Sequence, residues 1–344
     1  MERVVTLLLD TLNGRRGDAV PMWLMRQAGR YLPEYRALRA EKGGFLALVY
    51  DSEAAAEITV QPLRRFAFDG AILFSDILIV PYAMGQDLAF LAGEGPKLSP
   101  RLVDTTLESL QAVPERLEPI YRTVARVRSL LEPQTTLLGF AGSPWTVATY
   151  MIAGEGSRDQ HDARVLAYRD PAAMQAIIAA VEAVTVDYLA GQIAAGAQAV
   201  QLFDSWSGSL APAEFERWVI APTARIVAAL AERCPGTPVI GFPKGAGAKL
   251  PAYVRETGVR AVGVDETHDP RWIAANLSQD ICVQGNLDPL LLLAGGPAQD
   301  QAVARVLEAF ADRPHIFNLG HGIDRRTPIA HVERLVAQVR SWQG

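Results

Sequence analysis

The chain has 344 residues, of which 49% are hydrophobic and 21% charged, and its formal net charge is −5. This composition is typical of a globular protein, and the acidic balance argues against nucleic acid or an anionic membrane surface as a partner. The two cysteines, Cys234 and Cys282, form no C-x-x-C pair, and the amino-terminal apolar stretch is too short for a signal-peptide core. We therefore expect a cytoplasmic protein without disulfides or a membrane span.

Eight short apolar runs, each ending in a polar or glycine-rich corner, lie along the chain at residues 19–26, 70–76, 135–143, 197–205, 238–244, 261–265, 281–288 and 315–321. Helix-patterned segments separate them, among them 172–195, 212–233 and 289–310. Eight alternating β/α units predict an α/β fold: a (β/α)₈ TIM barrel, a single domain over residues 1–344, with the active site at the carboxyl ends of the strands. An open doubly wound sheet is the alternative, although no G-x-G-x-x-G follows the first run.

Local signals refine this outline. Residues 82–100 interrupt the alternation of apolar runs and helix-patterned segments. Their Gly-Glu-Gly-Pro stretch predicts a loop or hairpin inserted after the second strand. Ser143 followed by Pro144 predicts a helix N-cap and a first helical residue. Cys234-Pro235-Gly236 predicts the end of a helix.

The first corner is strongly basic. Arg26, Arg30, Arg36 and Arg39 lie close together with a single acid, Glu34, among them. Because arginine stays charged and binds carboxylates bidentately, this cluster at a barrel mouth indicates a polyanionic small molecule. The alternative is a solvated helix face on which Glu34 pairs with an arginine.

Two further corners carry candidate site residues. Asp76 ends the second run between apolar residues, where a carboxylate needs a partner. It could accept hydrogen bonds from ligand N–H groups, pair with a barrel arginine, or cap the next helix. Tyr150 lies about two helical turns beyond Ser143, where ordinary packing is the alternative to a role in the site.

Ser205 ends the fourth strand-like run but stands in no G-x-S-x-G frame, so we interpret it as a hydrogen-bond donor or a helix cap. His321 lies between Gly320 and Gly322, which predicts a sharp exposed turn and either a site or a structural histidine. No H-E-x-x-H motif or cysteine pair supports a metal site. Lys244 and Asp265 also end strands, and the sequence assigns a role to neither.

Taken together, these motifs resemble the uroporphyrinogen decarboxylase family. The segment P-M-W-L-M-R-Q-A-G-R-Y-L-P-E-Y-R resembles the family's amino-terminal signature, and G-F-A-G-S-P-W-T with the following T-Y-M resembles its second signature. F-S-D-I, Q-G-N-L-D-P and N-L-G-H-G follow in the same order as in the family. The resemblance covers nearly the whole chain.

The resemblance implies a (β/α)₈ barrel that works as a homodimer, with no metal or organic cofactor. It implies removal of carbon dioxide from the four acetate side chains of uroporphyrinogen III, a polyanionic tetrapyrrole, to give coproporphyrinogen III in haem and porphyrin biosynthesis. Carried over by position, the substrate-binding residues are Arg26, Gln27, Ala28, Gly29, Arg30, Arg39, Asp76, Tyr150, Ser205 and His321.

Decarboxylation of an arylacetate needs an electron sink, which a protonated pyrrole ring supplies. Asp76 beneath the pyrrole N–H groups would stabilise that cation. The resemblance points to Arg26 as the proton donor, although guanidinium is a very weak acid, and to Tyr150 as the residue that orients the acetate. The catalytic residues are therefore expected to be Asp76, Arg26 and Tyr150.

Two other functions remain possible at this stage. A zinc-dependent thiol or corrinoid methyltransferase of the same superfamily would need histidine and cysteine ligands at the corners. Cys282 begins a strand instead, at the opposite end from the corner. A carrier that binds the tetrapyrrole without turnover is the third hypothesis, and Asp76 argues against it.

Overall fold

The computed structural model describes residues 5–91 and 95–343. Seven strands form one sheet in which all neighbours are parallel, in the order β1-β4-β5-β6-β7-β8-β9. They are β1 (Gly70–Ile72), β4 (Thr136–Gly142), β5 (Ala199–Asp204), β6 (Val239–Pro243), β7 (Ala261–Gly263), β8 (Cys282–Leu287) and β9 (His315–Leu319). Each lies inside one of the predicted apolar runs, as expected for parallel strands buried on both faces. The sheet is curled and resembles a TIM barrel.

The first predicted strand, residues 19–26, is the exception. It forms no strand in the structure, and its ladder contact is a single bridge between Met22 and Phe317 of β9. The Phe317 N–H donates to the Pro21 carbonyl and the Asp69 N–H donates to the Met22 carbonyl. The segment therefore lies between the two edges of the sheet. Proline has no N–H to continue a ladder, which is one physical reason why pairing stays so short here.

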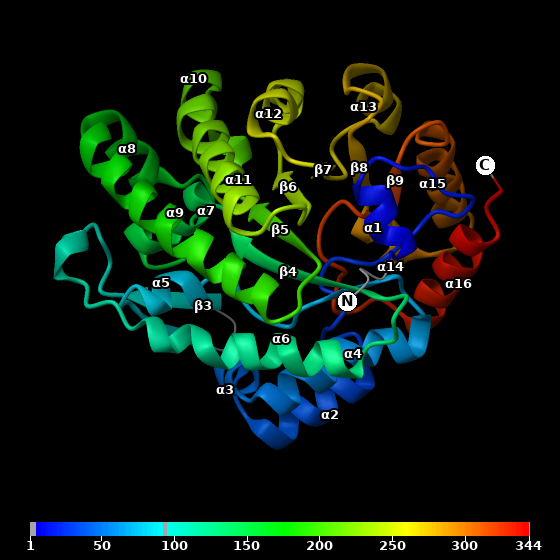
Figure 1. Ribbon diagram of the computed structural model, residues 1–344, viewed down its shortest axis with the longest axis horizontal. Coiled ribbons are helices and arrows are strands. Elements are labelled where there is room, and N and C mark those ends of the chain that lie inside the picture. The colour runs from blue at the N-terminus through cyan, green and yellow to red at the C-terminus, as the bar shows by residue number, and fades with distance from the viewer. Residues whose placement is uncertain (1–4, 92–94, 344) are drawn as a thin grey trace.

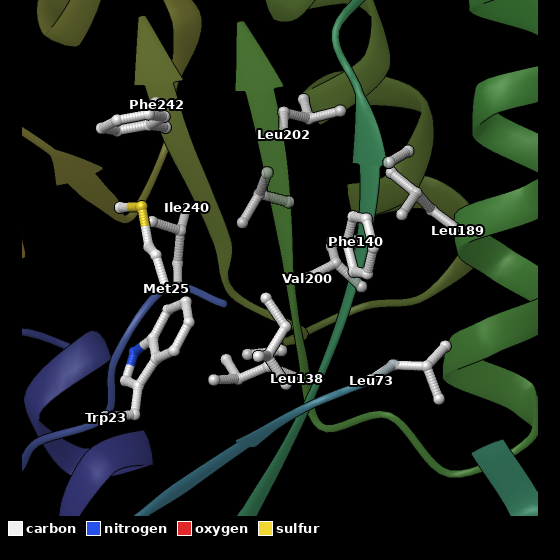
Figure 2. Packing of buried hydrophobic residues seen from close by; sticks show 14 of the residues in the cluster. Trp23, Met25, Leu73, Leu138, Phe140, Leu189, Val200, Leu202, Ile240 and Phe242 are labelled. Carbon is white, nitrogen blue, oxygen red and sulfur yellow. The ribbon is translucent and has the colours of Figure 1, made fainter. Parts of the chain in front are cut away.

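Buried polar side chains connect this segment to the far side of the interior. The Trp23 Nε1–H donates to Gln284 Oε1 on β8 at 3.0 Å, and the Gln284 amide donates to Gln201 Oε1 on β5 at 3.1 Å. Around this chain of hydrogen bonds, apolar side chains from the amino-terminal segment and from β4, β5 and β6 fill one core (Figure 2). Met25 and Phe242 belong to that core.

The interruption predicted at residues 82–100 contains a two-stranded antiparallel hairpin, β2 (Asp87–Leu91) and β3 (Gly95–Ser99). The hairpin prediction is confirmed, although Gly93 and Glu94 of the predicted Gly-Glu-Gly-Pro turn lie outside the described residues.

Helices surround the sheet (Figure 1). The α-helices are α1 (Leu7–Leu12), α2 (Pro33–Lys42), α3 (Phe45–Tyr50), α4 (Ser52–Phe66), α5 (Ile79–Ala83), α6 (Glu118–Leu130), α7 (Pro144–Ala153), α8 (His161–Arg169), α9 (Pro171–Ala194), α10 (Pro212–Phe215), α11 (Ala221–Arg233), α12 (Leu250–Thr257), α13 (Pro270–Asn276), α14 (Pro289–Ala294), α15 (Gly296–Ala309) and α16 (Ile329–Arg340). By length and composition alone, α9 could cross a membrane. In the structure it packs against α7, α8, α11 and β4.

The helix signals are largely confirmed. Residues 212–233 are helical throughout, with one π-helical turn at Glu216–Ile220 between α10 and α11, and the helix ends at Cys234. Residues 289–310 are divided into two helices at Gly295, which has φ 70°. Ser143 has the backbone of an N-cap, but its side chain accepts no capping hydrogen bond, and its buried hydroxyl has no partner among the described residues.

Candidate active site

Arg26 occupies a strained position at the end of the amino-terminal segment. Its φ of 60° lies in the left-handed region, which is unusual for a residue with a side chain. Two hydrogen bonds fix the residue before it: the Met25 N–H donates to Asn318 Oδ1, and the Ile323 N–H donates to the Met25 carbonyl, both at 2.9 Å. Strained residues held in this way are concentrated at functional sites. The Arg26 side chain is exposed and lies against Gly322.

Asp76 is half-buried in the corner that follows β1. Its Oδ1 accepts the Leu78 N–H at 2.8 Å, and the structure gives its Oδ2 no hydrogen bond and no ion pair among the described residues. Burial raises the pKa of Asp76 to about 6, an increase that the Leu78 N–H and the Arg26 guanidinium limit. Asp76 does not cap α5, whose N-cap is Leu78 and receives no side-chain capping bond. One oxygen therefore stabilises the turn before α5, and the other is left for a ligand.

Tyr150 lies on α7, half-buried beside Trp206, with the two ring centroids 6.3 Å apart. Burial raises the pKa of Tyr150, while Trp206 and Arg26 lower it and Asp76 raises it further. The phenol therefore keeps its proton at neutral pH and can donate a hydrogen bond. Tyr150 is therefore close enough to Asp76 and Arg26 for both charges to affect its phenol.

His321 follows β9 in the predicted turn, but it is half-buried, whereas the sequence predicted an exposed turn. Its ring is tilted by 40° to that of Phe242, with the two ring centroids 6.2 Å apart. Burial lowers the pKa of His321 to about 3, and the charges of Arg26 and Lys244 contribute to this shift, against a smaller opposing effect of Asp265. The imidazole is therefore neutral at physiological pH. It can offer one N–H donor and one acceptor, but it is not a cationic acid.

The structure thus brings four of the predicted residues together: Arg26 acts electrostatically on Asp76, Tyr150 and His321. The group offers one permanent cation, one carboxylate with an unfilled oxygen, and two neutral donors. Such an arrangement suits a ligand that carries both acidic groups and N–H groups. Among residues 5–91 and 95–343, no three His, Cys, Asp or Glu side chains are grouped so that they could hold a metal ion.

The residues between Arg26 and Arg30 shape the turn. Gln27 is fully buried: its Oε1 accepts the Leu24 N–H at 3.0 Å and its Nε2 donates to the Gly70 carbonyl at 2.9 Å. The Gln27 backbone N–H donates to the Leu24 carbonyl at 2.9 Å, so this donor and the side-chain amide are both used within the chain. The predicted substrate contact of Gln27 stays a prediction for its backbone carbonyl alone. Ala28 and Gly29 are half-buried, and a Cβ on residue 29 would lie 2.9 Å from the Arg26 carbonyl oxygen. The close turn therefore requires glycine at position 29.

Arg30 and Arg39 lie in a different place. They line a hollow of about 570 Å³ that none of Asp76, Tyr150 and His321 borders. Glu34, the acid expected to neutralise this region, forms a bidentate pair with Arg65 of α4 at 3.0 and 3.2 Å. Neither Arg30, which is exposed, nor Arg39, which is half-buried, forms an ion pair with a described residue. Glu34 does pair with an arginine, Arg65, so both the solvated-face alternative and the substrate-binding role stay predictions for Arg30 and Arg39.

Ser205 is half-buried between Asp204 and Trp206, and the structure gives its hydroxyl no hydrogen bond to a described residue. Beneath it, the Thr146 hydroxyl donates to Asp204 Oδ1 at 2.5 Å and accepts the Trp206 N–H at 3.1 Å. Burial raises the pKa of Asp204 to about 7. Asp204 is not among the residues predicted for the site. Its position at the end of β5 is the signal in the sequence that could have identified it.

Lys244 and Asp265, which the sequence left unassigned, both affect the charge around His321. Asp265 also binds the loops: its Oδ2 accepts the Gly245 N–H at 2.7 Å and its Oδ1 accepts the Thr267 N–H at 2.9 Å. Burial would raise the pKa of Asp265, but His268, the Thr267 hydroxyl and the Gly245 N–H hold it well below its usual range. Asp265 therefore stabilises the loops at the carboxyl ends of β6 and β7. Lys244 adds positive charge near His321.

Comparison with known proteins connects this site to a family. Residues 5–342 match the family model described as uroporphyrinogen decarboxylase. The uroporphyrinogen decarboxylase of Novosphingobium aromaticivorans is 73% identical over 335 residues, which are 97% of this chain and 98% of that protein. That of Erythrobacter litoralis is 69% identical over 337 residues, covering 98% and 99% of the two chains.

Solved structures share the fold at low identity. A methyltransferase from Methanosarcina mazei superposes with a TM-score of 0.80 at 16% identity, covering 96% of each chain. A B12-independent methionine synthase from Shewanella gives a TM-score of 0.57 at 8% identity over 95% of this chain and 96% of that chain. At such identities the likeness concerns the fold alone.

Proposed function

This chain belongs to the uroporphyrinogen decarboxylase family, and we propose that Asp76, Arg26 and Tyr150 carry out its reaction. The chain is a carboxy-lyase. The reaction removes carbon dioxide from the four acetate side chains of uroporphyrinogen III and gives coproporphyrinogen III, a step in haem and porphyrin biosynthesis. The substrate combines eight carboxylates with four pyrrole N–H groups.

Asp76 stabilises the electron-poor ring. A proton added to the ring carbon next to the one that bears the acetate converts the pyrrole into a conjugated iminium cation. The bond to the carboxylate carbon then breaks, carbon dioxide leaves, and its electron pair passes into the iminium. Protonation of the exocyclic carbon and loss of the added ring proton leave a methyl group on an intact pyrrole. The unfilled Oδ2 of Asp76 is the observation that carries this role, because it can accept pyrrole N–H groups and oppose the cation's charge.

Arg26 is the proton donor in this proposal, and Tyr150 orients the reacting acetate. His321 has a pKa of about 3 and is neutral, which leaves it as a hydrogen-bonding partner for a propionate or a pyrrole edge. The raised pKa of Tyr150 keeps its hydroxyl protonated and able to donate to the acetate. The interaction of Arg26 with Asp76, Tyr150 and His321 supports its central position.

The remaining predicted contacts complete the binding site. Arg30 and Arg39 bind outer carboxylates, Ser205 donates a hydrogen bond, and the backbone of Gln27, Ala28 and Gly29 approaches the ligand. The permanent charge of the two arginines and the absence of acidic partners for them within the described segments support the first of these roles.

Broader features of the fold, assembly and location are also proposed. The amino-terminal segment closes the curled seven-stranded sheet into a barrel, in the place of an eighth strand, which the hydrogen bonds of Pro21 and Met22 at both sheet edges support. The chain forms a single domain, works as a homodimer in the cytoplasm, and binds neither nucleic acid nor membranes. Its net charge of −5 agrees with the absence of polyanionic macromolecular partners. Light scattering on the purified chain tests the dimer.

The function is tested by incubating the purified chain with uroporphyrinogen III under anaerobic conditions, followed by chromatography of the oxidised products. We expect coproporphyrin together with porphyrins of five to seven carboxylates at early times. Full recovery of the eight-carboxylate porphyrin would overturn the function. Binding without turnover would instead support the carrier hypothesis.

A further inference from the structure

The hollow that contains Arg30 and Arg39 has two walls that come from distant parts of the sequence. One wall belongs to the turn and helix α2, and the other to the loop that follows His321. The lining residues are Arg30, Arg36, Arg39, Ala40, Gly43, Arg325 and Arg326. Five of these seven residues are arginines, in a protein whose overall charge is negative.

The positive charges in this hollow are mostly unneutralised. Arg326 forms a bidentate pair with Asp324, with both N···O distances at 2.9 Å. Arg36 donates to the carbonyls of Arg30 and Tyr31, which carry no charge. No carboxylate of a described residue lies within ion-pair distance of Arg30, Arg36, Arg39 or Arg325. After the one charge of Asp324 is subtracted, the five arginines leave an excess of four positive charges. Like charges gathered in one concave surface indicate a site for an anion.

Each wall of the hollow is continuous along the chain with a residue of the proposed catalytic site. Arg30 follows Arg26 by four residues, and Arg325 follows His321 by four residues. The two segments are in contact, because Gly322 lies directly against the Arg26 side chain. A ligand large enough to carry several carboxylates would therefore reach from the cleft into the hollow.

We propose that Arg36, Arg325 and Arg326 extend the substrate site into an outer subsite, which binds those carboxylates of the tetrapyrrole that are not reacting. This inference rests on the proposed function. One acetate reacts at a time, so the other carboxylates need positive partners throughout each turnover. Guanidinium groups bind carboxylates in a bidentate geometry, and five of them on two facing walls can hold more than one. Arg36 and the loop arginines thereby set affinity for a highly carboxylated ligand.

Arg325→Ala tests this subsite most cleanly, because no described residue pairs with Arg325 and its loss leaves the Asp324–Arg326 pair in place. Contacts to non-reacting carboxylates are equal in the ground and transition states, so their loss raises KM and spares kcat. We expect KM for uroporphyrinogen III to rise about three- to tenfold, with kcat within about twofold of the parent. Arg36→Ala should act in the same direction. Arg325→Lys, which keeps the charge but not the bidentate geometry, should give a smaller increase.

The controls remove the same charge elsewhere. Arg64→Ala on α4 and Arg255→Ala on α12 each delete an exposed arginine outside the hollow, at the carboxyl end of its helix. KM should stay at the parent value in both. Added salt should raise KM of the parent and of both controls more steeply than KM of Arg325→Ala, since the variant has lost part of the charge that salt screens.

An unchanged KM in both Arg325→Ala and Arg36→Ala would overturn the subsite while leaving the decarboxylase activity of the parent intact. A loss of kcat with constant KM would also overturn it, because that result would assign these residues to the chemistry or to the His321 loop. Failure of the parent itself to release carbon dioxide would instead refute the proposed function.

Discussion

The side chain of Arg26 lies directly over Gly322, so closely that a Cβ on residue 322 would come within 2.8 Å of both Arg26 Cγ and Nε. Glycine at this position therefore lets the arginine run across the turn after β9 and reach the cleft. Through this contact, the amino-terminal segment and the His321 turn define the position of a single guanidinium group.

Gly322→Ala should displace Arg26 without removing it. Residue 322 is not in the left-handed region, so alanine fits the backbone, and the three atoms nearest to the added methyl group all belong to the Arg26 side chain. We expect kcat to fall at least about tenfold, because small displacements of a positioned group are costly in catalysis. Steady-state assays measure this, with Gly44→Ala as the control, since a Cβ there has no atom within 4 Å. Parent-like turnover in Gly322→Ala would show that the position of Arg26 is not critical.

The strain at Arg26 predicts a separation of stability from activity. Its φ of 60° is unfavourable for any residue with a Cβ, and glycine relieves that cost. Arg26→Gly should therefore unfold at a higher temperature than Arg26→Ala, by a free-energy difference of about 1 kcal/mol. Both variants should lack activity. Thermal denaturation of the two proteins side by side gives the answer, and equal melting temperatures would mean that the turn relaxes when the side chain is removed.

The pKa of Asp76, raised by burial to about 6, predicts the acidic limb of the pH profile. Below that pH the carboxyl becomes protonated and no longer opposes the charge of the pyrrole cation, so kcat/KM should fall as the pH is lowered through about 6. His321 has a pKa of about 3 and does not titrate in this range. His321→Asn should consequently keep the same acidic midpoint at a lower rate. A midpoint that moves or disappears in His321→Asn would assign the limb to the histidine.

Asp204 predicts a pH dependence of stability rather than of rate. Burial raises its pKa to about 7 in the folded chain, above the value of about 3.9 expected after unfolding. The folded state thus holds a proton that the unfolded state has lost between about pH 4 and pH 7. The contribution of this proton to the free energy of unfolding is complete at about pH 4. It declines toward about pH 7 by about 1.4 kcal/mol per pH unit. Asn cannot ionise and keeps an oxygen for the Thr146 hydroxyl.

The melting temperature of Asp204→Asn, relative to the parent, should therefore increase between pH 5 and pH 7 and level off above. Asp76 titrates in both proteins and cancels in this difference. A constant difference across the range would place the pKa of Asp204 outside it.

Seven of the eight strands could be predicted because buried parallel strands leave continuous apolar runs in the sequence. The remaining run, residues 19–26, is also apolar, but it forms no strand. Residues such as Trp23 and Met25 are apolar because they fill the interior, not because their backbone forms a ladder. Hydrophobicity reports burial, and the hydrogen-bonding pattern that distinguishes a strand from an extended segment depends on the neighbouring β9 and Asp69.

The site was predictable to a similar degree. Arg26, Asp76, Tyr150 and His321 stand in motifs long enough to identify a family, and the structure brings them together. The buried amide of Gln27 could not be foreseen, since its partners, Leu24 N–H and the Gly70 carbonyl, are set by the fold. Arg325 belongs to no motif of its own. Its relevance follows only from the fold, which places the loop after β9 and helix α2 around one hollow.

The central claim is that the Asp76 carboxylate stabilises the cationic ring, and the turnover of Asp76→Asn at saturating uroporphyrinogen III tests it most directly. Asparagine keeps an oxygen for the Leu78 N–H, so the variant should fold with a melting temperature close to that of the parent. We predict that kcat falls by roughly 10²–10³, the scale for losing one preorganised electrostatic group. A folded Asp76→Asn protein whose kcat stays within a few-fold of the parent would contradict the claim.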